Sequence, residues 1–277
     1  AMSEATADNE KDLPVKEAKS ASTPGGLTHE RAGFGKNVWT IFTREFASYL
    51  NTPVAYIVIC VTLMLAGVYF FMYQGGVWQL DRASMNRLLT IVPWALCLFT
   101  IPLFTMRSLS EEKRLGTIEL LITMPVKDSE VILGKYFASL AVVGVQILLL
   151  AAYPLLMFSG MKMGDFDWGP FWSGILGLFL MSAAGVAIGL MFSSFTDSQI
   201  LAFFLSMATL VALYAIGSAV ESVKGTFGDV LAFFSFQSRF EPFARGVVDT
   251  RAVVYFVSIA VFCSLVAFRN LESRKWS

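Results

Sequence analysis

Charged side chains gather in one stretch of an otherwise apolar sequence, residues 106–136, which reads MRSLSEEKRLGTIELLITMPVKDSEVILGKY. Ser108 followed by Glu111 has the spacing of a capping box, in which two side chains satisfy the free N–H groups at a helix start. Glu111 and Arg114 are three residues apart, so they share one helical face and attract each other. The pattern predicts a short polar helix with an acidic first turn.

The same stretch also contains the signals that end one helix and begin another. Gly116 and Thr117 form a possible joint, and Pro125 stops the helix that residues 118–124 would continue. A second helix is expected to begin near Asp128 or Ser129 and to run into the next apolar segment. A plain connector needs only a few residues, so we interpret this segment of about thirty residues as a docking surface.

No catalytic or metal site can be assembled from the residue types present. A nucleotide-binding P-loop ends in Gly-Lys-Ser or Gly-Lys-Thr, whereas the two Gly-Lys pairs here precede Asn37 and Tyr136. There is no Gly-x-Ser-x-Gly elbow. The possible metal ligands are isolated: His29 lies in a polar segment, and apolar runs contain Cys60, Cys97 and Cys263. We therefore expect a chain that is not an enzyme and holds no cofactor or metal.

The rest of the sequence has the composition of an integral membrane protein. Of its 277 residues, 56% are hydrophobic and 15% are charged, and the mean hydropathy is +0.63. Soluble domains carry about 25% charged residues. Lys and Arg number 21, as do Asp and Glu, so no net charge attracts the chain to nucleic acid.

Six segments are long and apolar enough to cross the roughly 30 Å hydrocarbon core of a bilayer. None has Asp, Glu, Lys or Arg in its interior, and their approximate bounds are Ala55–Tyr73, Leu88–Thr105, Phe137–Phe158, Phe171–Phe192, Gln199–Ser218 and Val253–Phe268. Ion-coupled carriers keep ionisable residues at membrane depth, and channels line their pores with polar rings. The uncharged spans therefore disfavour both an ion-coupled carrier and a channel. The predicted fold is an all-α membrane protein with six transmembrane helices.

The chain is expected to divide into a tail and one transmembrane domain. Residues 1–34 are rich in Ala, Ser, Glu, Lys, Thr and Gly and have few large apolar side chains. They cannot bury enough surface to offset the entropy of ordering. We therefore predict a disordered tail at 1–34 and a six-helix transmembrane domain at 35–277.

An amphipathic helix is predicted at Asn37–Asn51, before the first span. Trp39 is a possible aromatic anchor, and the apolar residues recur at helical spacing: Val38, Phe42, Phe46, Tyr49 and Leu50. A helix of this kind lies in the membrane interface, and Pro53 marks the turn into the bilayer. The alternative is a plain extension of the first span.

An even number of spans places both termini on one side of the membrane. Lys and Arg favour the cytoplasmic side, and they are in modest excess in the segments that share a side with the termini. We expect both termini, and with them the stretch 106–136, in the cytoplasm.

Two smaller motifs leave alternatives open. The run SAAGVAIG at Ser182–Gly189 contains Gly185-x-x-x-Gly189, which allows helices to approach closely in lipid. Packing within one subunit is favoured over a seam between subunits. In SSFTDSQ at Ser193–Gln199, Asp197 and Ser198 either cap the fifth span or make a second cytoplasmic contact.

These motifs resemble those of a known family. The stretch 106–136, the run SSFTDSQ, and FARGVVDTRAVVYF at Phe243–Phe256 resemble the membrane subunit of ABC-2-type ABC transporters. Within that family the sequence is most similar to the permeases associated with bacterial gliding motility. The resemblance extends from about Val38 to Trp276.

The resemblance implies a coupling helix between the second and third spans that docks into a cleft of a separate ATPase subunit. In this sequence it comprises Ser110, Glu111, Glu112, Gly116, Thr117, Glu119 and Leu120. The helix at Asn37–Asn51 matches the family's connecting helix on the cytoplasmic membrane surface. Thr226–Gly246 matches the external half-helices before the sixth span. A plain interfacial aromatic loop is the alternative for that segment.

The resemblance also implies partners and an activity. Besides membrane lipids, the partners would be two ABC ATPase subunits and a second copy of this permease, in the inner membrane of a bacterium. ATP hydrolysis would drive transport, by family habit export, and the uncharged spans fit a lipidic or amphipathic cargo. The alternative is an ATP-driven complex that transmits force to a periplasmic accessory protein and moves no solute.

Overall fold

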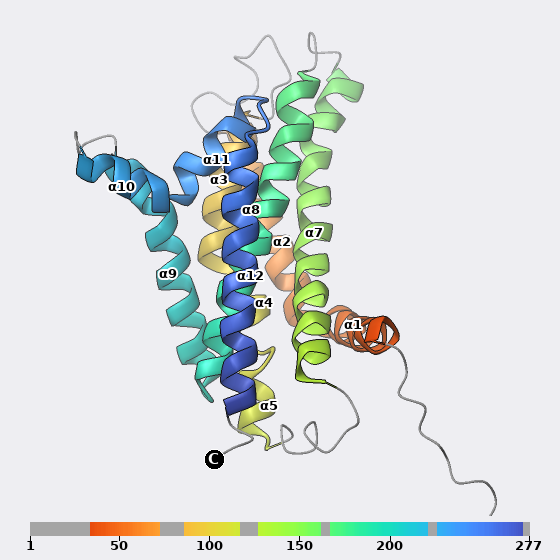
Figure 1. The fold of residues 1–277 in the computed structure, drawn as a ribbon. Coiled ribbons are helices and arrows are strands. Elements are labelled where there is room, and N and C mark those ends of the chain that lie inside the picture. The colour runs from red at the N-terminus through yellow and green to blue at the C-terminus, as the bar shows by residue number, and fades with distance from the viewer. Residues whose placement is uncertain (1–33, 73–85, 117–126, 162–166, 221–225, 274–277) are drawn as a thin grey trace, which may run out of the picture. The chain divides into compact units, whose positions relative to one another are not determined.

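The computed structural model describes residues 34–72, 86–116, 127–161, 167–220 and 226–273 (Figure 1). All regular elements in these ranges are helices. The predicted disordered tail, residues 1–34, lies outside the described residues except for its last residue. The described helices belong to one unit, Gly33–Ser277.

Six stretches of helix are long and apolar enough to cross a membrane, which confirms the predicted number and positions. They are α2 (Pro53–Met72), the interrupted stretch Leu88–Arg114, α7 (Asp128–Met161), α8 (Trp168–Phe195), α9 (Gln199–Val220) and α12 (Thr250–Ser273). The third helix begins at Asp128, as the sequence predicts, and continues into the span without a break. Its polar first turns precede the apolar run that is expected to begin at Phe137.

Two prolines interrupt the second span. It consists of α3 (Asn86–Ala95), the π-helical turn η3 (Leu96–Thr100) and α4 (Ile101–Thr105). Pro93 lies inside α3, and Pro102 lies in the first turn of α4. Proline has no N–H group and its ring collides with the preceding turn, so a wider turn relieves the distortion. This irregularity was not foreseen from the apolar composition.

Helix α8 packs against α7, α9, α11 and α12 and is the central helix of Figure 1. Its glycines let the second span approach closely. A Cβ atom added to Gly189 would lie 2.1 Å from Thr105 Oγ1, and one added to Gly185 would lie 2.8 Å from Ile101 Cδ1. The Gly-x-x-x-Gly motif therefore packs within the chain, as predicted.

Helix α1 (Phe34–Asn51) is distinct from the first span, because Thr52 separates it from α2. In Figure 1 α1 is seen nearly end-on, whereas α7, α8 and α12 run up the page. The alternative of a plain extension of the first span is therefore wrong. Helix α1 packs on α7, where a Cβ added to Gly134 would meet Ile41 Cγ2 at 2.6 Å.

The aromatic segment before the last span forms two short helices, α10 (Thr226–Phe234) and α11 (Phe236–Ala244). Ser235 separates them and accepts a hydrogen bond from the N–H of Ser238, 3.1 Å away. One aromatic row of α11 faces inward and is buried: Phe236, Phe240 and Phe243. The alternative of an interfacial loop is therefore wrong for this segment.

Candidate coupling site

The short helix α5 (Ser110–Arg114) begins in a buried position against α8. Its N-cap residue is Leu109, and no side chain of the same segment caps it. Instead, the hydroxyl of Ser193 at the end of α8 accepts hydrogen bonds from the N–H groups of Leu109, at 3.1 Å, and Ser110, at 3.0 Å. The predicted capping box of Ser108 and Glu111 is therefore wrong. A hydroxyl from another helix satisfies the free N–H groups.

The neighbouring residue, Ser194, joins α5 to the last span. Its carbonyl oxygen accepts hydrogen bonds from Lys113 Nζ of α5 and from Asn270 Nδ2 of α12. Carbonyl groups at the end of a helix have no partner within it, so they are available to such donors. Ser193 and Ser194 thus connect α8 with α5 and α12.

Further along SSFTDSQ, the hydroxyl of Ser198 accepts a hydrogen bond from the N–H of Leu201 at 3.5 Å. This contact supports the alternative in which Ser198 caps α9.

On its other side α5 is joined to α1 and α7 by a buried lysine. Lys135 Nζ of α7 lies 2.8 Å from Glu112 Oε1 of α5 and 3.1 Å from Glu45 Oε1 of α1. The lysine side chain is 3% exposed, and the two carboxylates are 20% and 17% exposed. We call Glu45, Glu112 and Lys135 the buried charge cluster.

The charges of this cluster stabilise one another in an environment that excludes most water. Burial by itself would raise the pKa of Glu45, but the Lys135 ammonium and the Arg44 guanidinium outweigh it and hold the pKa below the ordinary value of 4.5. Removing one partner of a buried ion pair lowers the stability of the fold, because the other charge remains desolvated. The cluster therefore favours one relative position of α1, α5 and α7.

Two further contacts hold α1 in place. Asn37 Nδ2 donates to Glu130 Oε2 of α7 at 3.0 Å, and the same oxygen accepts from Lys127 N at 3.0 Å, which caps the start of α7. At the other end of α1 the hydroxyl of Tyr49 donates to the carbonyl of Phe104, 3.0 Å away. Helix α1 is thus bonded to both the second and the third span.

The residues predicted for the coupling helix lie in different environments. Ser110 is fully buried, and Glu112 points to Lys135. Glu111 is half-buried, and Gly116 is exposed with a φ of +69°, which ends α5 in the left-handed conformation that glycine favours. The others lie outside the described residues: Thr117, Glu119 and Leu120.

Sequence reasoning missed several residues of this site. Leu115, at the end of α5, is 64% exposed next to the exposed Arg114, so α5 presents an apolar tip. Lys135 and Glu45 could have been found from a signal in the sequence, since a lysine within an apolar helix needs carboxylate partners. No local pattern marked Ser193 as the cap of α5.

Within the described residues the site is a junction at which α5 is connected with four other helices, α1, α7, α8 and α12. A family model described as ABC-2 family transporter protein matches residues 43–268. No curated protein matches the sequence. The match includes α5, the buried charge cluster and residues of all six spans. Members of this family are membrane subunits, and membership implies an ABC ATPase subunit as a partner. The chain therefore belongs to the ABC-2 family of transporter proteins, as a multi-pass membrane subunit of an ABC transporter.

Proposed function

We propose that this chain is the permease subunit through which a separate ATPase drives export, and that α5 is the helix on which the ATPase acts. One observation carries the proposal: α5 is bonded to α1 and α7 through Lys135, and to α8 and α12 through Ser193 and Ser194. A displacement of α5 would therefore act directly on α7 and α8, and through Lys135 and Ser194 on α1 and α12.

The exposed end of α5 supplies a surface for the ATPase. Leu115 is exposed next to Arg114, and apolar side chains rimmed by charge are typical of interaction sites. A cavity of about 330 Å³ lies behind α5, and Glu45, Phe104, Glu112 and Leu115 are among its lining residues. Close-packed interiors resist displacement, so this cavity leaves room for α5 to move toward α1. ATP binding would press α5 inward and tilt the attached spans as rigid bodies.

The proposed setting is the inner membrane of a bacterium, with two copies of the chain and two ATPase subunits. Asn37 at the start of α1 and Asn270 near the end of α12 are both bonded to helix ends that adjoin α5. Lysine and arginine side chains are frequent at this end, which supports a cytoplasmic location for α5 and for both termini.

The cargo is proposed to be lipidic or amphipathic, because the spans carry no ionisable residue in their apolar interiors. The resemblance of its motifs to those of gliding-motility permeases supports the proposal that the chain belongs to that subgroup. It also supports a second candidate function, in which the complex transmits force to a periplasmic accessory protein and moves no solute.

The coupling role can be tested with the chain assembled with its ATPase subunit in proteoliposomes. Leu115→Asp and Glu111→Arg should each lower ATPase binding and the stimulation of ATP hydrolysis, because the first places a charge on the apolar tip of α5 and the second reverses the charge beside it. Arg251→Glu is the control, since Arg251 is exposed at the start of α12, the end opposite Asn270. Unchanged binding and stimulation in both α5 variants would contradict the proposal.

The two candidate functions differ in a second measurement. Export predicts ATP-dependent movement of a fluorescent phospholipid across the proteoliposome bilayer, abolished when the ATPase cannot hydrolyse ATP. Force transmission predicts no movement, but predicts co-purification of a protein with a large periplasmic domain.

A further inference from the structure

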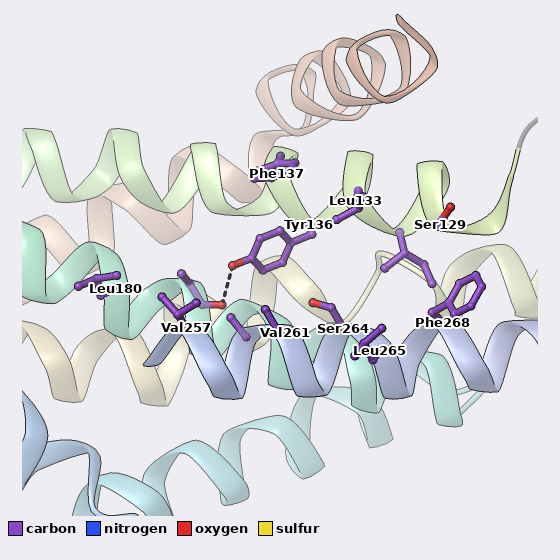
Figure 2. A pocket seen from close by; sticks show the side chains of 13 residues that line it. Ser129, Leu133, Tyr136, Phe137, Leu180, Val257, Val261, Ser264, Leu265 and Phe268 are labelled. Carbon is purple, nitrogen blue, oxygen red and sulfur yellow. Dashed lines mark hydrogen bonds between the residues drawn. The ribbon is translucent and has the colours of Figure 1, made fainter. Parts of the chain in front are cut away.

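An apolar groove runs between α7, α8 and α12, and its lining includes no residue of the buried charge cluster. Figure 2 shows side chains of α7 and α12 facing each other across it. The groove has a volume of about 460 Å³. Representative lining residues are Leu133 and Phe137 of α7, Leu180 of α8, and Val257, Val261 and Leu265 of α12. The hydroxyl of Tyr136, which also lines it, already donates to the Ala183 carbonyl at 3.2 Å.

The walls of this groove are exposed rather than closed by other parts of the described chain. Phe137 and Val257 are each 46% exposed, and Leu265 is 57% exposed. All three lie in transmembrane spans. Apolar surface at membrane depth is covered by hydrocarbon or by another apolar helix, so the groove has an occupant of that chemistry.

The dimensions fit a single acyl chain better than a protein. The row from Val257 to Phe268 on α12 extends about 16 Å at 1.5 Å per residue. One leaflet contributes roughly 15 Å, half of the hydrocarbon core. Thirteen residues line the groove, whereas a stable protein interface has roughly 20–30 residues on each side. The volume lies in the range of about 300–1,000 Å³ found for small-molecule sites.

The charges beside the groove match a phospholipid headgroup. Arg269 follows Val261 and Leu265 at four-residue spacing, so it continues the lining row of α12 beyond the apolar part. Its side chain is 80% exposed and lies 3.3 Å from Glu272, which is 40% exposed. A guanidinium group binds phosphate through two N–H groups, and a carboxylate accepts hydrogen bonds from an ammonium group. The pair therefore complements a zwitterionic headgroup.

We propose that this groove binds one acyl chain of a phosphatidylethanolamine molecule from the leaflet at the α5 end, with the lipid phosphate at Arg269. The acyl chain lies along α12 between α7 and α8. This binding site goes beyond the proposed coupling function and is independent of the cargo.

The complex with the ATPase subunit, extracted in mild detergent from phosphatidylethanolamine membranes, can be examined by native mass spectrometry. The wild-type chain should retain one phospholipid. Val257→Trp should lower retention at least about tenfold, because each displaced methylene costs roughly fourfold in affinity. Val254→Trp is the matched control, since Val254 is exposed on the same helix but does not line the groove. Leu265→Trp is a second filling variant should Val257→Trp fail to fold.

The headgroup contact has its own test. Arg269→Gln should lower retention roughly threefold to tenfold, since a charge-assisted hydrogen bond is lost. Arg251→Gln, at the other end of α12, should leave retention unchanged. Absence of lipid from the wild type, or equal retention in the filled variants, would overturn the proposal. So would a disulfide-linked dimer of Leu265→Cys in a chain without Cys60, Cys97 and Cys263, because a second copy would then occupy the groove.

Discussion

Lys135 of α7 lies 2.8 Å from Glu112 of α5, in a position where the lysine side chain is 3% exposed. This contact places a charge of the third span against the helix that we propose as the ATPase contact. The same ammonium reaches Glu45 of α1, so three helices meet at one nitrogen atom. The strength of this arrangement can be measured.

Lys135→Met should destabilise the chain by about 3–5 kcal/mol, because it removes the buried cation that Glu45 and Glu112 share while their carboxylates stay largely desolvated. Thermal unfolding of the purified chain in detergent measures the loss. The matched control is the triple variant Lys135→Met, Glu45→Gln and Glu112→Gln, which removes all three charges and should recover most of the stability. A single variant as stable as the wild type would show that the cluster does not hold the helices together.

The hydroxyl of Ser193 is predicted to be essential for the position of α5. Ser193→Ala leaves the buried N–H groups of Leu109 and Ser110 without their acceptor and should cost about 1–3 kcal/mol. Hydrogen exchange at these two amides should accelerate, as followed by mass spectrometry. Ser218→Ala is the control, since that hydroxyl is exposed and bonds only within α9. Unchanged exchange would mean that α5 is capped in another way.

Close packing of α8 on the second span predicts a steric effect at Gly189. In Gly189→Ala the new Cβ would lie 2.1 Å from Thr105 Oγ1, so the two helices must separate, at a cost of about 1–3 kcal/mol. Gly144→Ala is the matched control, because its Cβ would lie at an ordinary 3.5 Å from Phe179 Cε2. Thermal unfolding should show a lower midpoint for Gly189→Ala than for Gly144→Ala. Equal stability would show that α8 and α4 are less tightly packed than described.

The lowered pKa of Glu45 predicts how its contribution depends on pH. Because the pKa in the folded chain is below 4.5, the contribution is complete above pH 4.5 and is lost as the pH falls through the folded value. The stability difference between the wild type and Glu45→Gln should therefore be constant near neutral pH and shrink in acid. Thermal unfolding over a pH series measures it. A difference that grows as the pH falls would contradict this assignment.

Much of the fold could be predicted because membrane spans are specified locally. Each of the six apolar runs must satisfy its backbone within a helix in lipid, whatever its neighbours are. The helix end at Gly116 could also be predicted, since glycine adopts the left-handed conformation at a helix end without strain. The π-helical turn between Pro93 and Pro102 could not be predicted from the sequence, because prolines permit several local distortions and packing selects among them.

The sequence predicted a short polar helix in this stretch, but it did not predict the contacts of that helix. The charged stretch identified α5, yet Ser108 was assigned as the cap that Ser193 provides, and Glu112 was assigned to a docking face although it pairs inside the molecule. Such contacts join residues far apart in the chain, and a local pattern has no information about which distant group comes within 3 Å.

The sequence by itself determined a six-span helical membrane protein, because hydrophobic length is a property of single segments, and its motifs resemble those of the ABC-2 family. Only the tertiary structure decided that Lys135 joins α1, α5 and α7, and that α5 is held by Ser193 and Ser194 of α8. The physical reason is that desolvated charges and buried N–H groups require partners, and the identity of the partner depends on which helices pack together.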